Sequence, residues 1–291
     1  MYNDKIRLAV KVALATYRPI LVRGASGWGK SSLARSAANY LGRKYREKVV
    51  SSRTQVRDLL YDADVLRRLN DARGENATEL PWENYIRPEA LWWAIDAESA
   101  TTQLARYSGG KSDVKEQSVD ASDWAKGAVV LIDEIDKADP DVPNGLLVPL
   151  GSFQFRVEEQ DDRLIKLEKQ PPPLVFITTN EERELPPAFL RRCVELNLPA
   201  IDADPDGKIR RELLVNIGKA HFEGLLSDSD INKIADKLVP AAAQPTVAKE
   251  RQIPSPAEFI DTLQAVWQLK IDPGSTTFDE VARITVWKHQ L

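Results

Sequence analysis

Hydrophobic residues recur along this 291-residue chain at two spacings, and these spacings predict its helices and strands. The three- and four-residue repeat of one helix face appears in four segments, 5–16, 31–42, 54–71 and 88–107. Short apolar runs bounded by polar residues predict strands at 19–23, 47–52, 128–132, 173–179 and 193–198. Because strands and helices alternate, we predict an α/β fold with a mostly parallel sheet.

The pattern changes in the last third of the chain, where we predict no further strand. Helical spacing returns in four segments, near 206–223, 228–239, 256–269 and 277–288. Before the third of these, Ser255 can act as an N-cap, Pro256 suits the first helical position, and Glu258 completes a capping box. We therefore expect two domains, residues 1–203 and 204–291, the second of them small and helical.

Local patterns add detail to this outline. Residues 153–169 alternate between apolar and polar on either side of a Gln-Asp-Asp stretch, which predicts a β-hairpin. Two polar stretches, 74–84 and 108–127, are expected to be surface loops. Trp92 and Trp93 are neighbours on one predicted helix and point in different directions, so we expect one in the core and the other at a subunit contact or a pore.

The composition is that of an ordinary globular protein, with 43% hydrophobic and 29% charged residues. No apolar run approaches the roughly 20 residues of a membrane helix, and the first residues lack the layout of a signal peptide. The single cysteine, Cys193, excludes an internal disulfide and is expected to be packed. These features favour a cytoplasmic protein. The net charge of −4 argues against nucleic acid as the main partner.

A glycine-rich stretch lies between the first predicted strand and the helix that follows it. It fits the pattern G-x-x-x-x-G-K-[ST], in which backbone N–H groups and a helix N-terminus bind phosphate, while the lysine and a hydroxyl reach the terminal phosphates and Mg²⁺. A glycine turn without a ligand is the alternative, which the strand–loop–helix order disfavours. The candidate nucleotide-binding residues are Gly24, Ala25, Ser26, Gly27, Trp28, Gly29, Lys30, Ser31 and Ser32.

Candidate magnesium and catalytic residues follow two later strands. Asp133 and Glu134 end one apolar run, so we expect Asp133 to hold Mg²⁺ through water, beside the Ser31 hydroxyl. Glu134 is expected to activate the attacking water as general base. Asn180 ends the next strand and is expected to orient that water and to sense the γ-phosphate. The alternatives are a solvated turn for the two acids and a turn former for Asn180.

Two arginines, Arg191 and Arg192, precede the last predicted strand. A guanidinium at this place can stabilise the γ-phosphate charge of a neighbouring subunit, and a solvated helix end is the alternative.

Together these motifs resemble the AAA+ ATPases, and more narrowly their MoxR-type branch. The segment Leu185–Arg192 is similar to the branch's L-P-x-A-x-x-D-R, with Arg191 in place of the acidic residue. The resemblance makes Arg192 the arginine finger. It implies a P-loop αβα sandwich with a five-stranded parallel sheet, followed by an all-α lid. It also implies an insert in the second helix at about 60–88, and places the hairpin at about 153–169 before the sensor strand.

The resemblance also implies a function. ATP and Mg²⁺ would be bound, the chain would form a ring, commonly a hexamer, and ATP hydrolysis would drive chaperone-like remodelling or activation of a partner protein. Such partners include proteins with von Willebrand A-type domains, proteases and other effectors. One position departs from the branch, because Ala257 stands where an arginine is usual in the third lid helix. Arg251 is a nearby candidate to replace it, and a solvated loop arginine is the alternative.

Two other functions stay open at this point. A nucleotide-gated scaffold would bind ATP to assemble and hardly turn it over, which the missing lid arginine favours and Glu134 opposes. A DNA-handling motor is the third candidate, which the acidic net charge disfavours. Phe153 and Phe155 in the hairpin are expected either to grip a client or to brace the hairpin on its own subunit. We assign no metal or proton-transfer role to His221 or His289.

Overall fold

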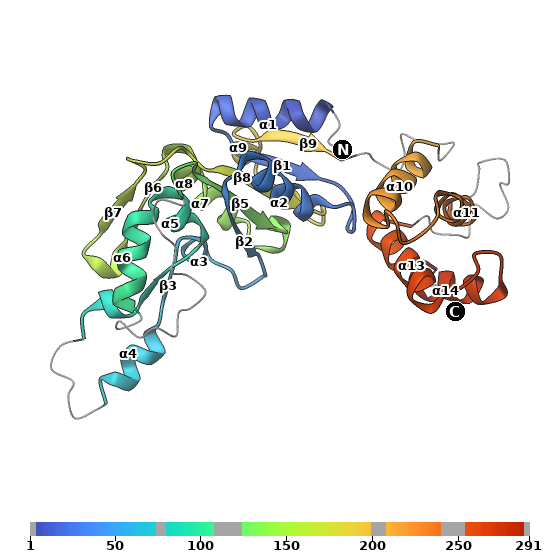
Figure 1. Ribbon diagram of the computed structural model, residues 1–291. Helices are drawn as coiled ribbons and strands as arrows, with labels where there is room; N and C mark the ends of the chain where they lie inside the picture. Colours follow the sequence, from blue (N-terminus) through green and yellow to red (C-terminus); the bar gives the residue numbers. More distant parts are fainter. Residues whose placement is uncertain (1–3, 74–79, 108–123, 199–207, 240–253, 288–291) are drawn as a thin grey trace. The chain divides into compact units, whose positions relative to one another are not determined.

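The computed structural model describes residues 4–73, 80–107, 124–198, 208–239 and 254–287 of the chain. It separates into two compact units (Figure 1). The first is built from Met1–Arg23 and Lys30–Asn197, and the second from Gly24–Gly29 and Leu198–Leu291. The predicted boundary between residues 203 and 204 lies outside the described residues.

A five-stranded parallel sheet forms the centre of the first unit, with the strand order β2-β5-β8-β1-β9. The three central strands are buried along nearly their whole length, which requires helices on both faces of the sheet. The predicted α/β sandwich with five parallel strands is therefore confirmed. The strands are β1 (Ile20–Arg23), β2 (Lys44–Val49), β5 (Ala128–Asp133), β8 (Leu174–Thr179) and β9 (Val194–Asn197).

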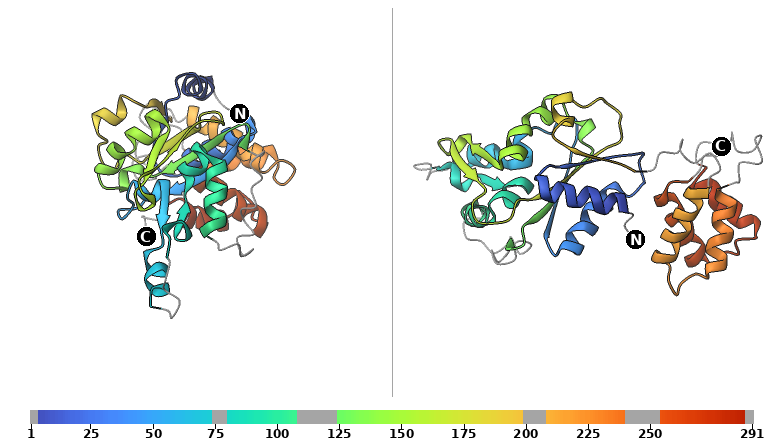
Figure 2. Two further views of the ribbon diagram at one scale, coloured as in Figure 1. Left: turned by 90° about the vertical axis from the view of Figure 1, so that its left-hand side faces the viewer. Right: turned by 90° about the horizontal axis from the view of Figure 1, so that it is seen from above.

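Helices flank this sheet, as Figures 1 and 2 show. α1 (Asp4–Thr16) packs on β1 and β9, while α2 (Lys30–Leu41) packs on β2, β5 and β8. α2 forms because Leu33, Ala34 and Ala37 repeat on the face that meets the sheet, where all three are buried. Among the described residues, no helix combines the length and the apolar character that a membrane crossing requires.

The chain between β2 and β5 corrects two predictions. The helix predicted at 54–71 is wrong in its middle, where an extended segment forms β3 and pairs antiparallel with β4. The helix predicted at 88–107 is divided at Asp96, whose carboxylate accepts the Ser99 N–H at 3.1 Å and so starts a new helix. The elements are α3 (Arg57–Leu60), β3 (Tyr61–Ala63), α4 (Val65–Asp71), β4 (Ile86–Pro88), α5 (Ala90–Ile95) and α6 (Ala97–Tyr107).

The helix α4 lies between β3 and β4 and projects away from the sheet of the first unit, as Figures 1 and 2 show. Asp64 caps it by accepting the Arg67 N–H at 2.9 Å. Three large apolar side chains on α4 are exposed, Val65 by 53%, Leu66 by 75% and Leu69 by 49%. This helix therefore carries apolar surface that the described residues do not cover.

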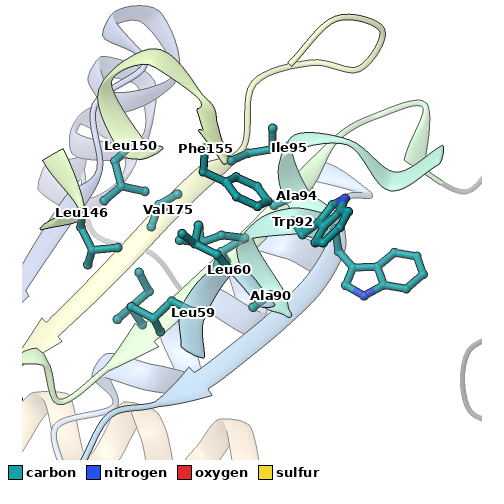
Figure 3. Packing of buried hydrophobic residues seen from close by; sticks show 14 of the residues in the cluster. Leu59, Leu60, Ala90, Trp92, Ala94, Ile95, Leu146, Leu150, Phe155 and Val175 are labelled. Carbon is teal, nitrogen blue, oxygen red and sulfur yellow. The ribbon is translucent and has the colours of Figure 1, made fainter. Parts of the chain in front are cut away.

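The helix α5 corrects the expectation for the two tryptophans, because Trp92 and Trp93 are both buried, with 0% and 2% exposed. All six residues of α5 are buried, as in a helix enclosed on every side. Trp92 lies edge-on to Phe155, with ring centroids 5.6 Å apart (Figure 3). Trp93 stacks on Trp124, which was expected in a surface loop, and the Arg46 guanidinium lies 5.0 Å from the Trp93 ring.

The alternation at 153–169 is confirmed as a hairpin, in which β6 (Gln154–Val157) pairs antiparallel with β7 (Arg163–Lys166). Phe155 points into the core between Trp92 and Tyr61, so it braces the hairpin on its own chain. Phe153 is half-buried and packs at the edge of the same core. Three short helices around the hairpin and the last strand were not predicted, α7 (Asp141–Gly145), α8 (Leu147–Ser152) and α9 (Pro187–Leu190).

We expect the Trp92→Ala substitution to destabilise the first unit by about 3–5 kcal/mol, the usual cost of truncating a buried aromatic side chain. The loss includes the hydrogen bond from Trp92 Nε1 to Ser99 Oγ at 2.8 Å. Urea unfolding measures the change, and Tyr40→Ala, on an 84% exposed side chain, is the matched control, expected within about 0.5 kcal/mol of wild type. Equal stability of wild type and Trp92→Ala would contradict this packing.

The second unit contains the four predicted helices of the C-terminal part. Their apolar faces meet in a separate core that includes Leu214, Ile234, Phe259 and Phe278, all fully buried. The predicted capping box is confirmed, because Ser255 Oγ accepts the Glu258 N–H while the Glu258 carboxylate accepts the Ser255 N–H. The helices are α10 (Lys208–His221), α11 (Asp228–Leu238), α13 (Pro256–Leu269) and α14 (Thr276–Thr285).

Candidate active site

The site of the first unit lies at the carboxyl edge of the sheet. Asp133 is the last residue of β5, and Asn180 directly follows β8, its neighbour in the sheet. Lys30 and Ser31 begin α2, which packs against both of these strands. Ends of adjacent parallel strands at one edge are the usual place for ligands in an open α/β sheet.

Three of the predicted site residues form one chain of hydrogen bonds. The Lys30 ammonium donates to Asn180 Oδ1 at 2.7 Å, and Asn180 Nδ2 donates to Glu134 Oε1 at 3.4 Å. The second oxygen of Glu134 accepts from the Lys137 ammonium at 2.7 Å. The Asn180 side chain therefore lies between the positive group of Lys30 and the carboxylate of Glu134, so its orientation can respond to both.

Ser31 and Asp133 are also brought together. The Ser31 hydroxyl lies 3.0 Å and 2.9 Å from the two oxygens of Asp133. Thr178 Oγ1, which is fully buried in β8, donates to Asp133 Oδ1 at 2.5 Å and accepts the Glu134 N–H at 2.9 Å. A hydroxyl and a carboxylate oxygen at this separation are the hard oxygen ligands that suit Mg²⁺.

Glu134 has a left-handed backbone, with φ of +61° and ψ of 49°. A non-glycine residue rarely adopts this conformation, which costs of order 1–3 kcal/mol and persists where the surrounding structure holds it. Thr178 supplies part of that support through the Glu134 N–H. Lys137 supplies more, and the hydrogen bond to Glu134 raises the pKa of the Lys137 ammonium.

Lys30 is a buried cation, with 7% of its surface exposed. Burial lowers the pKa of its ammonium, and the carboxylates of Asp133, Asp136 and Glu134 oppose this shift. The arrangement places the buried Lys30 ammonium among several carboxylates, one of which, Glu134, is also paired with Lys137. It therefore fits a ligand that is anionic at one end and accompanied by a divalent cation.

The glycine-rich stretch belongs to the second unit. Gly24, Gly27 and Gly29 have φ values of +151°, +79° and +76°, which L side chains rarely adopt. A Cβ on Gly27 would also lie 2.6 Å from Ser255 Oγ. This backbone fits the cradle that the motif predicts. In the rest of the glycine-rich stretch, Ala25 and Ser26 are exposed and Trp28 is half-buried. Ser32 lies in the first turn of α2, in the first unit, and is exposed.

Arg192 lies at the other edge of the sheet, two residues before the start of β9. The register of β9 with β1 begins with Val194 opposite Ile20, so Arg192 and Arg18 both lie just before the amino ends of these two strands. Both arginines are exposed and line a cavity of about 500 Å³, walled by apolar side chains such as Leu150. Neither guanidinium forms an ion pair or hydrogen bond within the described part of the chain. The four residues of β9 alone span about 10 Å, and Arg192 lies before the first of them, so it is remote from the carboxyl edge of its own sheet.

Sequence reasoning missed three residues of the site: Asp136, Lys137 and Thr178. Thr178 and Asp136 are polar residues at buried positions, a pattern that is visible in the letters ITTN and DEID but that has several explanations. Lys137 is three residues after Glu134, the spacing of neighbours on a helical turn. That spacing was a usable signal.

The remaining candidates have simple surroundings. Cys193 is buried, its thiol donates to the Phe189 carbonyl at 3.4 Å, and burial raises its pKa to about 12. Ala257 lies in the first turn of α13, where its N–H donates to the Gly27 carbonyl at 3.2 Å within the second unit. His221 is exposed at the end of α10. Arg251 and His289 lie outside the described residues.

Comparison with known proteins gives a family match. The family model of the AAA domain (dynein-related subfamily) matches residues 19–193. No curated protein matches the chain.

Solved structures similar to this chain include a point mutant of RuvB from Thermotoga maritima, with 16% identity and a TM-score of 0.49 over 97% of this chain and 68% of that one. The Thermotoga maritima RuvB Holliday junction branch migration motor gives 16% identity and a TM-score of 0.46, covering 97% of this chain and 67% of that one. A proposed ATPase from Cytophaga hutchinsonii gives 14% identity and a TM-score of 0.42, covering 90% of this chain and 62% of that one.

Proposed function

This chain belongs to the AAA domain family, in its dynein-related subfamily, and from that premise we propose that it binds ATP with Mg²⁺ and hydrolyses it. The observation that carries the proposal is the hydrogen-bonded chain from Lys30 through Asn180 to Glu134. It combines a phosphate-binding cation, a polar sensor and a carboxylate base in one cluster. The ATPase activity, the cofactors and the residue roles below are parts of this proposal.

The phosphate-binding residues are divided by role. The glycine cradle Gly24–Gly29 would offer backbone N–H groups to the phosphates, and Lys30 its charge to the β- and γ-phosphates. Ser31 and Asp133 would hold Mg²⁺, with Asp133 acting through water. Bound Mg²⁺ neutralises charge on the phosphoryl group that is transferred to water.

The catalytic step is assigned to Glu134 and Asn180. Each Glu134 oxygen has a second lone pair beyond its present hydrogen bond, so the carboxylate can accept a proton from a water molecule. Asn180 Nδ2 already donates to that carboxylate, and its Oδ1 accepts from Lys30. Movement of Lys30 toward a phosphate would free this amide to orient the water. Asn180 would thereby couple phosphate contact to the position of the base.

Arg192 is proposed to act on the nucleotide of a neighbouring copy. Its place at the amino edge, separated from the carboxyl edge by the whole length of β9, supports action between copies rather than within one. The absence of any ion pair to its guanidinium within the described residues leaves it available. A contact of one edge with the opposite edge of the next copy is heterologous and generates a ring when its rotation closes. We propose a ring, with a hexamer as the first candidate.

The Glu134→Gln substitution tests the proposal. We expect steady-state ATP turnover to fall about 10²- to 10⁴-fold, because the amide cannot take the proton, while nucleotide affinity stays close to wild type. Phosphate release and titration with a fluorescent ATP analogue measure the two quantities. Asp141→Ala is the matched control, since Asp141 is an exposed acid in the first turn of α7. Wild type that binds no ATP would refute the proposal.

The output of hydrolysis is proposed to be remodelling or activation of a partner protein, as in a MoxR-like chaperone. The exposed apolar residues of α4, Val65, Leu66 and Leu69, support a protein partner, because apolar surface on a projecting element commonly marks a protein contact. A von Willebrand A-type domain, a protease or another effector are the candidate partners that the MoxR resemblance brings. Trapping with Glu134→Gln in ATP is the experiment that identifies the partner.

A nucleotide-gated scaffold is the second candidate function. Ala257 favours it, because this position in the first turn of α13 carries a methyl group where the resemblance expects a guanidinium, and a methyl group cannot sense a phosphate. The ion pair between Lys137 and Glu134 also favours it, since the base is partly engaged. Wild type and Glu134→Gln would then turn over ATP equally slowly, while ATP would still drive assembly.

A further inference from the structure

We infer that Asp136 is a positioning residue that fixes the loop carrying Asn180. This inference rests on the proposed function for its link to catalysis, although the contact itself does not. Asp136 follows Glu134 by two residues and is 3% exposed, so its carboxylate is among the most buried charged groups of the first unit. A buried carboxylate is retained only where strong partners compensate for its lost hydration.

The partners of Asp136 are backbone groups of the turn after β8. One oxygen, Oδ2, accepts the Asn180 N–H at 3.1 Å and the Glu182 N–H at 3.0 Å. Two N–H groups converging on one anion form a small anion-binding concavity of the kind that successive backbone amides make. The carboxylate of one loop therefore holds the backbone of the next.

This turn needs such support. Glu181, between the two donors, has φ of +63°, in the left-handed region that a glutamate seldom adopts. Its N–H is also held, by Thr179 Oγ1 at 2.9 Å. Without the Asp136 acceptor, two N–H groups of the turn would lose their partner, and the turn would be free to relax toward ordinary backbone angles.

The position of the Asn180 amide depends on this backbone. Its Oδ1 contacts Lys30 and its Nδ2 contacts Glu134, and the latter contact is already long at 3.4 Å. A small displacement of the backbone would break it, since hydrogen bonds weaken steeply with distance and angle. Asp136 therefore acts on the reaction through Asn180, without touching the nucleotide.

The other oxygen, Oδ1, has no hydrogen-bond partner within the described residues. Asp136 can act in two ways. Its hydrogen bonds hold the backbone of the turn after β8, and its negative charge favours the charged form of Lys30. An asparagine retains a carbonyl oxygen that can accept both N–H groups, but it carries no charge. We assign the effect to the hydrogen bonds.

The test compares Asp136→Ala, Asp136→Asn and wild type as the full chain. In nucleotide-free protein, we expect amide hydrogen exchange of residues 178–184 to be at least about tenfold faster in Asp136→Ala, and near wild type in Asp136→Asn. We expect kcat to fall about 10- to 100-fold in Asp136→Ala with little change in KM, the usual range for removing a residue that orients a functional group. Asp136→Asn should lose less than about fivefold, because the acceptor is kept.

Several outcomes would overturn the inference. If amide exchange of residues 178–184 is unchanged in Asp136→Ala, then Asp136 does not hold the backbone of this turn. A folded Asp136→Asn that is as slow as Asp136→Ala would assign the effect to charge. If Asp136→Ala does not fold, the exchange and kcat of Asp136→Asn, compared with the exposed control Asp141→Ala, still decide between hydrogen bonds and charge. If the wild type does not turn over ATP, the proposed function is refuted. The exchange measurement would still test whether Asp136 holds the backbone of the turn after β8.

Discussion

Arg192→Ala is expected to lower ATP turnover about 10³- to 10⁵-fold, the range that a guanidinium at the γ-phosphate contributes. Nucleotide affinity should stay near wild type, because the cradle and Lys30 of each copy are intact. The physical reason is the position of Arg192 at the amino edge of the sheet, opposite the cluster of Lys30, Asp133 and Asn180. Turnover and nucleotide titration, measured on the same preparation, separate the two effects.

Mixing two inactive variants tests whether Arg192 acts between copies. Arg192→Ala keeps Glu134, and Glu134→Gln keeps Arg192, so a shared interface can be complete. In a random equimolar mixture about a quarter of the sites have both groups, and turnover should recover to about that fraction of wild type. No recovery in assemblies shown to be mixed would contradict action between copies. Arg191→Ala is the matched control, since Arg191 is also exposed but does not line the cavity.

The Lys30→Ala substitution should weaken ATP binding by about 30- to 5,000-fold, the equivalent of the 2–5 kcal/mol lost when one partner of a buried charge pair is truncated. Two effects add. First, the phosphates lose a cation. Second, the carboxylates of Asp133, Glu134 and Asp136, whose charge the Lys30 ammonium now offsets, would repel the phosphates. Calorimetric titration with Mg²⁺-ATP measures the change.

The control for this variant is Lys11→Ala, which removes an exposed lysine from α1 of the same unit. It should bind ATP as wild type does. Thermal unfolding of the nucleotide-free proteins then excludes misfolding as the cause of lost binding. Wild-type affinity in a folded Lys30→Ala variant would refute the assignment of Lys30 as a phosphate-binding residue.

The parts that the sequence predicted well have local causes. Four of the parallel strands, β1, β5, β8 and β9, follow from apolar runs between helices, and the capping box of α13 follows from the spacing of Ser255 and Glu258. The strand β2 lies three residues before the predicted 47–52, because it is half-exposed and carries mostly polar residues. The grouping of Lys30, Asp133 and Asn180 was also predictable, because each directly follows or faces the end of a buried strand. These features need only local pattern and one rule of sheet geometry.

The parts that it missed depend on contacts between distant segments. β3 interrupts a good helical repeat because Tyr61 pairs across to Pro88, 27 residues later in the chain. Trp92 and Trp93 are both buried because the hairpin covers one and Trp124 stacks on the other. No periodicity within α5 contains that information. Tertiary contacts override local preference in such places.

The contacts of Asp136 and Lys137 were missed for a different reason. In the sequence, both residues are charged neighbours of Glu134, and such residues usually lie on a solvated surface. Only the approach of the turn after β8 makes Asp136 a buried acceptor. The residue types therefore suggested a polar segment, while the fold decided which of them is enclosed.

Arg192 and the Lys30 cluster lie at opposite edges of one sheet, and this placement determines how many complete sites an assembly of copies can contain. An open row of copies would always end in one cradle that no guanidinium reaches and one guanidinium that reaches no cradle. A row of n copies then holds n − 1 complete sites, whereas a closed circle holds n. Turnover per copy would thus rise with protein concentration as short rows lengthen, and level off once circles form.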